Sequence, residues 1–238
     1  MIEEYITESV GECERIFESL FNVYDLQSDA PCGSLKIYRK SFKVESKNLQ
    51  IYKMNFFCWL MNFSIIKAYN SCELLLLRSI QLAYFPALGN PLGNRKNMKI
   101  IQDRIKGSVE NADTTNNRYI IEFLKVKSEE FSAFVSQIVR VDLKTNWSGF
   151  FEMISILRNV IAHHGTIVNI DTLNQIKMNA KDVFERHFSL IADKAGFKLL
   201  HPKFGESFSN FLNLINDFSL NTAKFIFNEN DLSFLDLN

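Results

Sequence analysis

The stretch WSGFFEMISILRNVIAHH, residues 147–164, decides how this chain folds. Its apolar side chains recur with the three-and-four spacing of one face of an α-helix. They are Phe150, Met153, Leu157 and Val160, and His164 continues the stripe. This spacing predicts a helix that buries one face in the core of a helical protein. Gly165 predicts the end of the helix, because glycine readily adopts the left-handed conformation that closes helices.

The polar residues near the end of this helix indicate chemistry. Asn159 and His163 are four residues apart and share a helix face, and Glu152 lies within roughly 20° of the same line. Arg158 lies off this line, so only its long side chain can reach back around the helix. Asn is disfavoured inside helices, which favours a functional role for Asn159. An arginine can hold a phosphate and a histidine can move a proton near neutral pH, the minimum equipment for cleaving RNA without a metal.

The pattern Arg158-Asn159-x-x-x-His163, followed by a glycine and an apolar segment that ends at Ile170, resembles HEPN domains. HEPN domains are all-α bundles, and many are metal-independent endoribonucleases of toxin–antitoxin, abortive-infection and CRISPR-linked systems. In that family the Arg–His motifs of two protomers meet at a dimer interface and form one active site. The resemblance therefore implies RNA as the substrate, a homodimer, and Arg158, Asn159 and His163 as the catalytic residues.

Three further residues are candidates for supporting roles in such a site. His164 also has a spacing from Arg158 that the family permits, and Glu152 lies on the polar line of the helix. Glu73 lies in the run CELLLLR, residues 72–78, which is similar to the family's earlier core helix, where acidic residues sometimes support the catalytic pair. Glu73 shares this run with Arg78, and the alternative for it is a buried or rim ion pair. The alternative for the whole motif is a non-catalytic helical domain that binds a partner or a nucleotide.

The composition is that of an ordinary globular protein. The chain has 238 residues, of which 47% are hydrophobic, and its formal net charge is zero. These values allow one large domain, or one domain with an extension. They exclude the polycationic character of many nucleic-acid binders, so contact with RNA depends on local clusters of basic residues.

The sequence predicts neither a metal site nor a cofactor. The four cysteines are Cys13, Cys32, Cys58 and Cys72. They form no Cys-x-x-Cys pair and none lies near a histidine, while His187 and His201 are expected to be structural or surface residues. Because no signal peptide is recognised, we expect reduced thiols and a cytoplasmic location. The most apolar run, residues 54–66, is shorter than the roughly 20 residues that span a bilayer and predicts a buried helix.

The remaining segments predict an all-α helical bundle with an N-terminal helical extension and short accessory strands. The expected helices are 2–27, 49–85, 118–141, 147–164, 171–188 and 206–227. The connections are a strand or extended arm at 35–53, a break at 86–94, a loop at 107–117 and a hairpin of 190–191 with 197–200. We expect residues 1–48 to form an N-terminal helix plus basic arm, and residues 49–238 to form the HEPN-like domain.

Two basic runs, 36–53 and 95–106, are candidates for contact with phosphates, with a solvated protein face as the alternative. The second run is preferred, and its basic residues are Arg95, Lys96, Lys99, Arg104 and Lys106. We expect a twofold homodimer with the C-terminal halves of the 147–164 helices near the axis. An antitoxin or defence-system partner is a further expectation.

Overall fold

The computed structural model describes residues 32–37, 40–88, 95–109, 117–164, 166–192 and 197–230, with side chains over 57–88, 99–109 and all later described ranges. The chain divides into two units, Met1–Lys67 and Ala68–Asn238, and each is described by itself. The sequence-based boundary after residue 48 remains a prediction. The helix expected at 2–27 and the helix-closing Gly165 lie outside the described residues.

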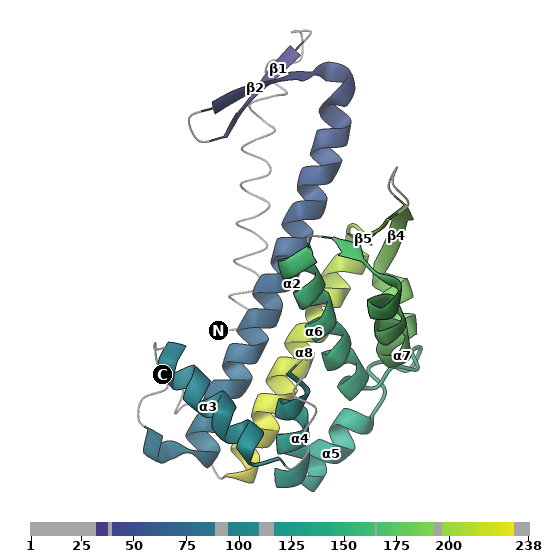
Figure 1. Cartoon of the computed structure of the whole chain (residues 1–238). Helices are drawn as coiled ribbons and strands as arrows, with labels where there is room; N and C mark the ends of the chain where they lie inside the picture. Colours follow the sequence, from purple (N-terminus) through teal and green to yellow (C-terminus); the bar gives the residue numbers. More distant parts are fainter. Residues whose placement is uncertain are drawn as a thin grey trace. The chain divides into compact units, whose positions relative to one another are not determined.

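The first unit contains a β-hairpin and the beginning of a long helix. Strands β1 (Cys32–Ile37) and β2 (Lys40–Glu45) pair antiparallel, with Leu35 opposite Phe42 (Figure 1). Helix α2 (Ser46–Tyr84) follows directly and continues into the second unit. The strand alternative for the 35–53 segment is therefore correct as far as residue 45, where the helix takes over.

The apolar run at 54–66 lies on α2, but part of it is at the surface. The side chain of Trp59 is 58% exposed, and its ring stacks on Phe63 with 5.7 Å between the ring centroids. The Lys67 ammonium lies 5.5 Å from the centroid of the Phe63 ring. Cys58, Leu60, Met61 and Ile65 of the run are buried as expected, whereas the Trp59–Phe63 face is exposed and carries the cation–π contact.

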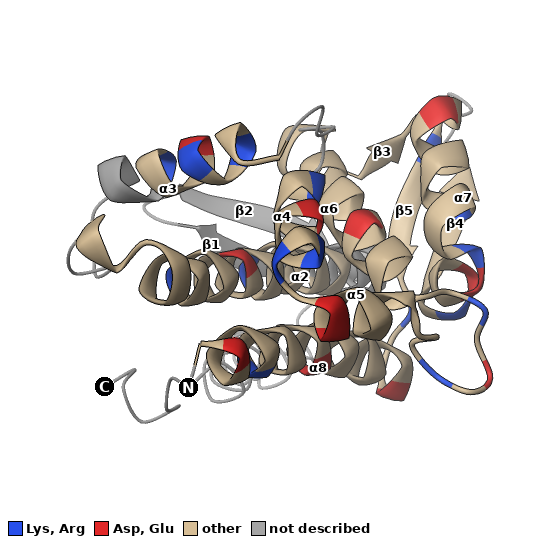
Figure 2. Cartoon of the chain, turned by 90° about the horizontal axis from the view of Figure 1, so that it is seen from below, with Lys and Arg blue, Asp and Glu red and all other residues tan. Residues whose placement is uncertain are grey.

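The second unit is a helical bundle. Its helices after α2 are α3 (Arg95–Gly107), α4 (Arg118–Lys127), α5 (Glu129–Ser136), α6 (Trp147–His164), α7 (Ile170–His187) and α8 (Glu206–Glu229), with a short 3-10 helix at Pro86–Leu88. The predicted all-α fold with accessory strands is confirmed. The basic run at 95–106 forms α3, along which basic residues flank one acidic residue (Figure 2).

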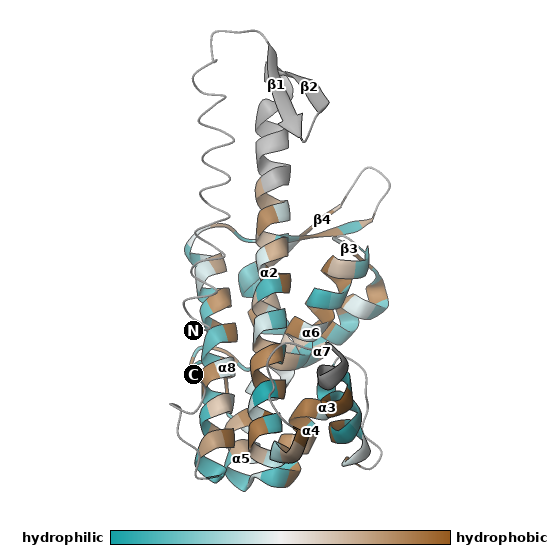
Figure 3. Ribbon diagram, turned by 90° about the vertical axis from the view of Figure 1, so that its left-hand side faces the viewer, coloured by the Kyte–Doolittle hydropathy of each residue, from teal (hydrophilic) through white to brown (hydrophobic). Residues whose placement is uncertain are grey.

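Aromatic side chains hold α5, α6 and α8 together. Phe134 of α5 lies 5.6 Å from Trp147 of α6, measured between ring centroids. Phe218 of α8 lies 6.0 Å from Trp147 and 5.1 Å from Phe151. Each helix mixes apolar and polar residues along its length (Figure 3). Full burial of such a ring contributes roughly 1.5–3 kcal/mol relative to leaving it exposed, so these contacts stabilise the packing of the three helices.

The segment expected as one helix from 118 to 141 is divided at Ser128. The Ser128 backbone is extended (φ −142°, ψ 119°), and its Oγ accepts a hydrogen bond from the Phe131 amide at 3.0 Å. Serine is a favoured N-cap, so it ends α4 and begins α5 in one residue. Residues 137–146 then form a loop closed by a β-bridge between Ile138 and Asn146, where a helix had been expected to reach 141.

A small antiparallel sheet covers one end of the bundle's later helices. Its strands are β3 (Ile167–Val168), β4 (Phe188–Ala192) and β5 (Lys198–Pro202), in the order β3-β5-β4. The predicted hairpin is confirmed as β4 and β5. The two residues of β3 are too few for an alternating pattern, and the sequence did not reveal them.

A close approach of two backbones sets the position of α6 against α7. A Cβ placed on Gly149 would lie 2.3 Å from the Asn179 carbonyl oxygen. Asn179 precedes Ala180, whose φ of −154° and ψ of 54° interrupt α7. Only glycine leaves room for that carbonyl, so this position couples the start of α6 to the irregular turn of α7.

Candidate functional site

Helix α6 has the predicted extent and buries the predicted stripe. Phe150, Met153, Leu157 and Val160 are all buried. His164 was expected to continue this stripe, and that expectation is wrong. Ala162, His163 and His164 are all exposed, so the last turn of α6 lies at the surface and the buried stripe ends at Val160.

Arg158 and Asn159 are joined directly. The Arg158 side chain reaches around the helix, and its Nη1 donates a hydrogen bond to Asn159 Oδ1 at 2.8 Å. Both residues are partly buried, and Arg158 Nε is buried with no hydrogen-bond partner among the described residues. His163 lies one turn further on, in the last turn of α6.

Glu152 is engaged within its own chain. Its Oε2 lies 3.7 Å from Arg118 Nη1 at the start of α4, and the side chains are 18% and 46% exposed, respectively. At this distance and exposure the ion pair contributes little to stability. The polar line of α6 thus runs from an ion-paired Glu152 through a half-buried Asn159 to an exposed His163.

Glu73 belongs to a polar cluster beneath α6. Its Oε1 accepts a hydrogen bond from Asn117 Nδ2 at 2.8 Å, and the same nitrogen lies 2.5 Å from the Tyr69 hydroxyl. Ser155 of α6 donates to that hydroxyl at 3.0 Å. Burial raises the pKa of Glu73, while the nearby Arg158 guanidinium, the Asn117 hydrogen bond and Lys106 lower it.

Among the described residues, Glu73 and Arg78 do not form the structural ion pair that was the alternative. Five positions along a helix turn by about 140°, so the two side chains point to different sides of α2. Arg78 Nε is buried and has no hydrogen-bond partner in the described part of the chain. Glu73 instead lies within electrostatic reach of Arg158, on the side of the predicted motif.

One residue of the basic run is close to this cluster. Lys106 acts on Glu73, and its ammonium lies 4.8 Å from the centroid of the Tyr119 ring. Burial raises the pKa of Tyr119, and Glu73 raises it further. Lys99 and Arg104 are exposed on α3, and the side chains of Arg95 and Lys96 lie outside the described residues.

The sequence did not identify Tyr69, Asn117 or Ser155 as parts of the site. Asn117 lies at the end of the polar stretch expected as a loop. Asparagine is common in loops, so its presence there indicates no function. In the structure it has φ 59° and ψ 17°, a left-handed backbone. Its partner Tyr69 is 48 positions away in the sequence, and local patterns do not reveal a pairing of that range.

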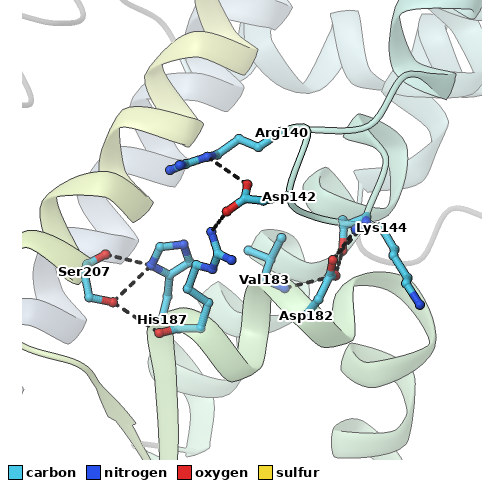
Figure 4. A network of polar contacts seen from close by, with 9 residues as sticks. Arg140, Asp142, Lys144, Asp182, Val183, His187 and Ser207 are labelled. Carbon is cyan, nitrogen blue, oxygen red and sulfur yellow. Dashed lines mark hydrogen bonds and ion pairs between the residues drawn. The ribbon is translucent and has the colours of Figure 1, made fainter.

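A second polar cluster ties the 137–146 loop to α7, and α7 to Ser207 at the start of α8 (Figure 4). Asp142 pairs with Arg186 at 2.5 Å and with Arg140 at 3.4 Å. Asp182 accepts hydrogen bonds from the Thr145 hydroxyl and from the backbone amides of Lys144 and Thr145. This cluster anchors the segment that enters α6.

His187 lies beside this second cluster and has a structural role, as predicted. The ring is 2% exposed, and its Nδ1 donates to the Ser207 carbonyl oxygen at 2.7 Å. Burial lowers the pKa of His187, and the charges of Arg186, Arg140 and Lys203 lower it further, against the raising effect of the Ser207 bond. His187 is therefore held as the neutral imidazole.

The described residues contain no group of three or more His, Cys, Asp or Glu side chains that could hold a metal ion. Within the same ranges, every helix is too short or too polar to cross a membrane. Comparisons with protein-family models, with curated proteins and with solved structures found no match. The class that the fold and site define is therefore a helical bundle with an Arg–Asn–His motif at one helix end.

Proposed function

We propose that this protein is a metal-independent endoribonuclease of the HEPN type. The observation that carries the proposal is the end of α6, where the bonded pair Arg158–Asn159 lies one turn before an exposed His163. A phosphate-binding cation and a titratable imidazole thus share one helix end, outside the buried stripe. We further propose a toxin or phage-defence setting, because the resemblance to HEPN domains implies one.

The proposed reaction is attack of a ribose 2′-hydroxyl on the neighbouring phosphorus. The 2′-oxygen forms a bond to phosphorus, the bond to the 5′-oxygen breaks, and the products carry a 2′,3′-cyclic phosphate and a 5′-hydroxyl. His163 handles the proton, and Arg158 binds the scissile phosphate and the charge that builds on it. Asn159 orients the guanidinium through its 2.8 Å hydrogen bond.

One α6 helix supplies one arginine and one histidine, whereas the reaction needs a base for the 2′-hydroxyl and an acid for the 5′-oxygen. A twofold homodimer brings two motifs together and provides both. We therefore propose that the last turns of two α6 helices meet near the axis. Of the described basic side chains of α3, Lys106 is the one whose charge acts on Glu73, so we propose that it helps to draw RNA toward this site.

The test is cleavage of RNA in EDTA by the wild type and by His163→Ala. We expect metal-independent products with cyclic phosphate ends from the wild type, and a loss of about 10²–10⁴-fold in His163→Ala. His164→Ala is the matched comparison, since His164 is also exposed on the same turn and is the other histidine with a permitted spacing from Arg158; we expect the larger loss in His163→Ala. Cleavage that requires Mg²⁺, or that survives His163→Ala, overturns the mechanism.

The dimer has a separate test. Sedimentation at micromolar concentration is expected to give a dimer, and a heterodimer of His163→Ala with Arg158→Ala protomers is expected to regain part of the lost activity if each site draws on both chains. A monomer under these conditions contradicts the shared site.

One observation favours the non-catalytic alternative. Arg158 donates a hydrogen bond to Asn159 of its own chain, as arginines with a purely structural role do. In that case Arg158→Ala lowers thermal stability and no preparation cleaves RNA.

A further inference from the structure

Asn117 is an outlier of the backbone. Among the described residues it is the non-glycine residue with a positive φ, at 59°. The left-handed conformation costs a residue with a Cβ about 1–2 kcal/mol, and asparagine is among the residues that tolerate it best. A conformation of this kind persists where surrounding contacts require it, and such contacts concentrate at functional sites.

The side chain of Asn117 is also diverted from its usual task. Asn117 directly precedes α4, and asparagine is one of the strongest N-cap residues. Its side chain makes no capping hydrogen bond. Its amide nitrogen binds Tyr69 and Glu73 of α2 instead, at 2.5 Å and 2.8 Å.

These bonds connect three helices next to the motif. Tyr69 and Glu73 are four positions apart and share a face of α2. The Tyr69 hydroxyl also accepts a hydrogen bond from Ser155. Ser155 lies on α6, less than one turn before Arg158. A single asparagine amide thus links the start of α4 to α2 and, through Tyr69, to the motif helix.

Glu73 is held near Arg158 without neutralising it. The two charges interact, yet they form no ion pair among the described residues. Asn117 Nδ2 donates a hydrogen bond to Glu73 Oε1, so the hydrogen-bond donor to the Glu73 carboxylate is an amide and not the Arg158 guanidinium. The negative charge therefore acts on Arg158 across space, while the guanidinium keeps its hydrogen bond to Asn159 and no described ion pair to Glu73 occupies its other N–H groups.

We propose that Asn117 is a positioning residue, whose amide clamps Glu73 and Tyr69 of α2 against α6 and so sets the carboxylate charge that orients Arg158. The proposal rests on the proposed function in so far as Arg158 is the phosphate-binding residue. The burial of Glu73 raises its pKa, and the Asn117 hydrogen bond opposes that rise, so the amide also favours the ionised carboxylate.

The experiment uses the full-length chain with two substitutions at Asn117. Asn117→Gly keeps the left-handed backbone accessible and removes only the amide. Asn117→Asp keeps the size and tolerates the same backbone, but sets a second carboxylate against Glu73. The control is Asn230→Gly, which removes an amide hydrogen bond of 2.8 Å to the Ile226 carbonyl at the end of α8.

The first readout is the pKa of Glu73, measured from the chemical shift of its carboxyl carbon in an NMR titration. We expect Asn117→Gly to raise it and Asn117→Asp to raise it further, with no change in Asn230→Gly. The second readout is RNA cleavage, where kcat falls about tenfold in Asn117→Gly with KM little changed, and the acid limb of the pH profile moves to higher pH.

The outcomes separate this proposal from the proposed function. Folded Asn117 variants with an unchanged Glu73 pKa overturn the clamp, and so does an unchanged kcat in an enzyme that depends on His163. If the wild type fails to cleave RNA while the Glu73 pKa still rises, the nuclease proposal fails and the clamp on the carboxylate stands.

Discussion

The two polar clusters of the second unit use charge in opposite ways. In the 137–146 loop, Asp142 and Asp182 are both bonded to side chains or amides of the same chain. At the end of α6, Arg158 is bonded to Asn159 but forms no ion pair among the described residues, and His163 is exposed; Glu73 lies within electrostatic reach of Arg158. Charges that are fully paired hold a loop in place, whereas charges left partly unpaired are available to a ligand.

The largest expected effect is on catalysis by the Arg158–Asn159–His163 site at the end of α6. Arg158→Lys is expected to lower kcat/KM by about 10²–10³-fold, because a lysine keeps the charge but loses the planar fork that binds Asn159 and a phosphate together. Steady-state cleavage of an RNA oligonucleotide measures it. Thermal unfolding serves as the control and is expected to change little, since the site is built for binding. Full activity in Arg158→Lys would show that only a point charge is needed there.

The next effect concerns the contact that orients α6. Gly149→Ala places a methyl group 2.3 Å from the Asn179 carbonyl oxygen, so α6 or α7 must shift. We expect a loss of about 3 kcal/mol in the free energy of unfolding, at the upper end for overpacking. Urea denaturation measures it, with Gly107→Ala as the matched control because nothing lies within 4 Å of a Cβ at Gly107. Equal stabilities of the two variants contradict the close approach.

His187, which lies beside the cluster of the 137–146 loop, is expected to make the free energy of unfolding depend on pH. Burial lowers the folded-state pKa of His187 below 6.5, so between these two values the unfolded chain binds a proton that the folded chain does not. Stability is therefore full above about pH 6.5 and falls as pH drops toward the folded-state pKa.

Calorimetry between pH 8 and pH 5 measures this slope. His187→Asn is expected to flatten it, because an amide can donate to Ser207 in place of Nδ1 without titrating. His201, whose pKa burial also lowers, leaves a smaller slope of the same sign. A slope unchanged by His187→Asn would place the titration elsewhere.

The smallest effect on stability is expected at the ion pair between Glu152 of α6 and Arg118 of α4. Glu152→Gln removes a contact of 3.7 Å between partly exposed groups, and we expect a change below about 0.5 kcal/mol. Thermal unfolding at low and high salt measures it. A loss well above this value would show that Glu152 has a partner beyond Arg118, such as a second protomer.

Prediction from sequence succeeded where the pattern was local and strongly periodic. The bounds of α6 and its buried stripe followed from the spacing of apolar residues and from Gly165, and the hairpin of β4 and β5 followed from two apolar segments that flank a turn. It failed where one polar side chain sets a helix boundary. Ser128 caps α5 and so divides the segment expected as one helix from 118 to 141. It also failed at the ends of elements, since His164 has the spacing of a core residue but lies on an exposed last turn.

The sequence by itself determined that an arginine, an asparagine and a histidine stand at the end of an apolar helix, because helical geometry converts spacing into position. Only the tertiary structure decided what surrounds them. Ser155 and Tyr69 are 86 positions apart, and Asn117 meets Glu73 across 44 positions. Such pairings depend on how whole helices pack and on one left-handed residue, which no local pattern encodes.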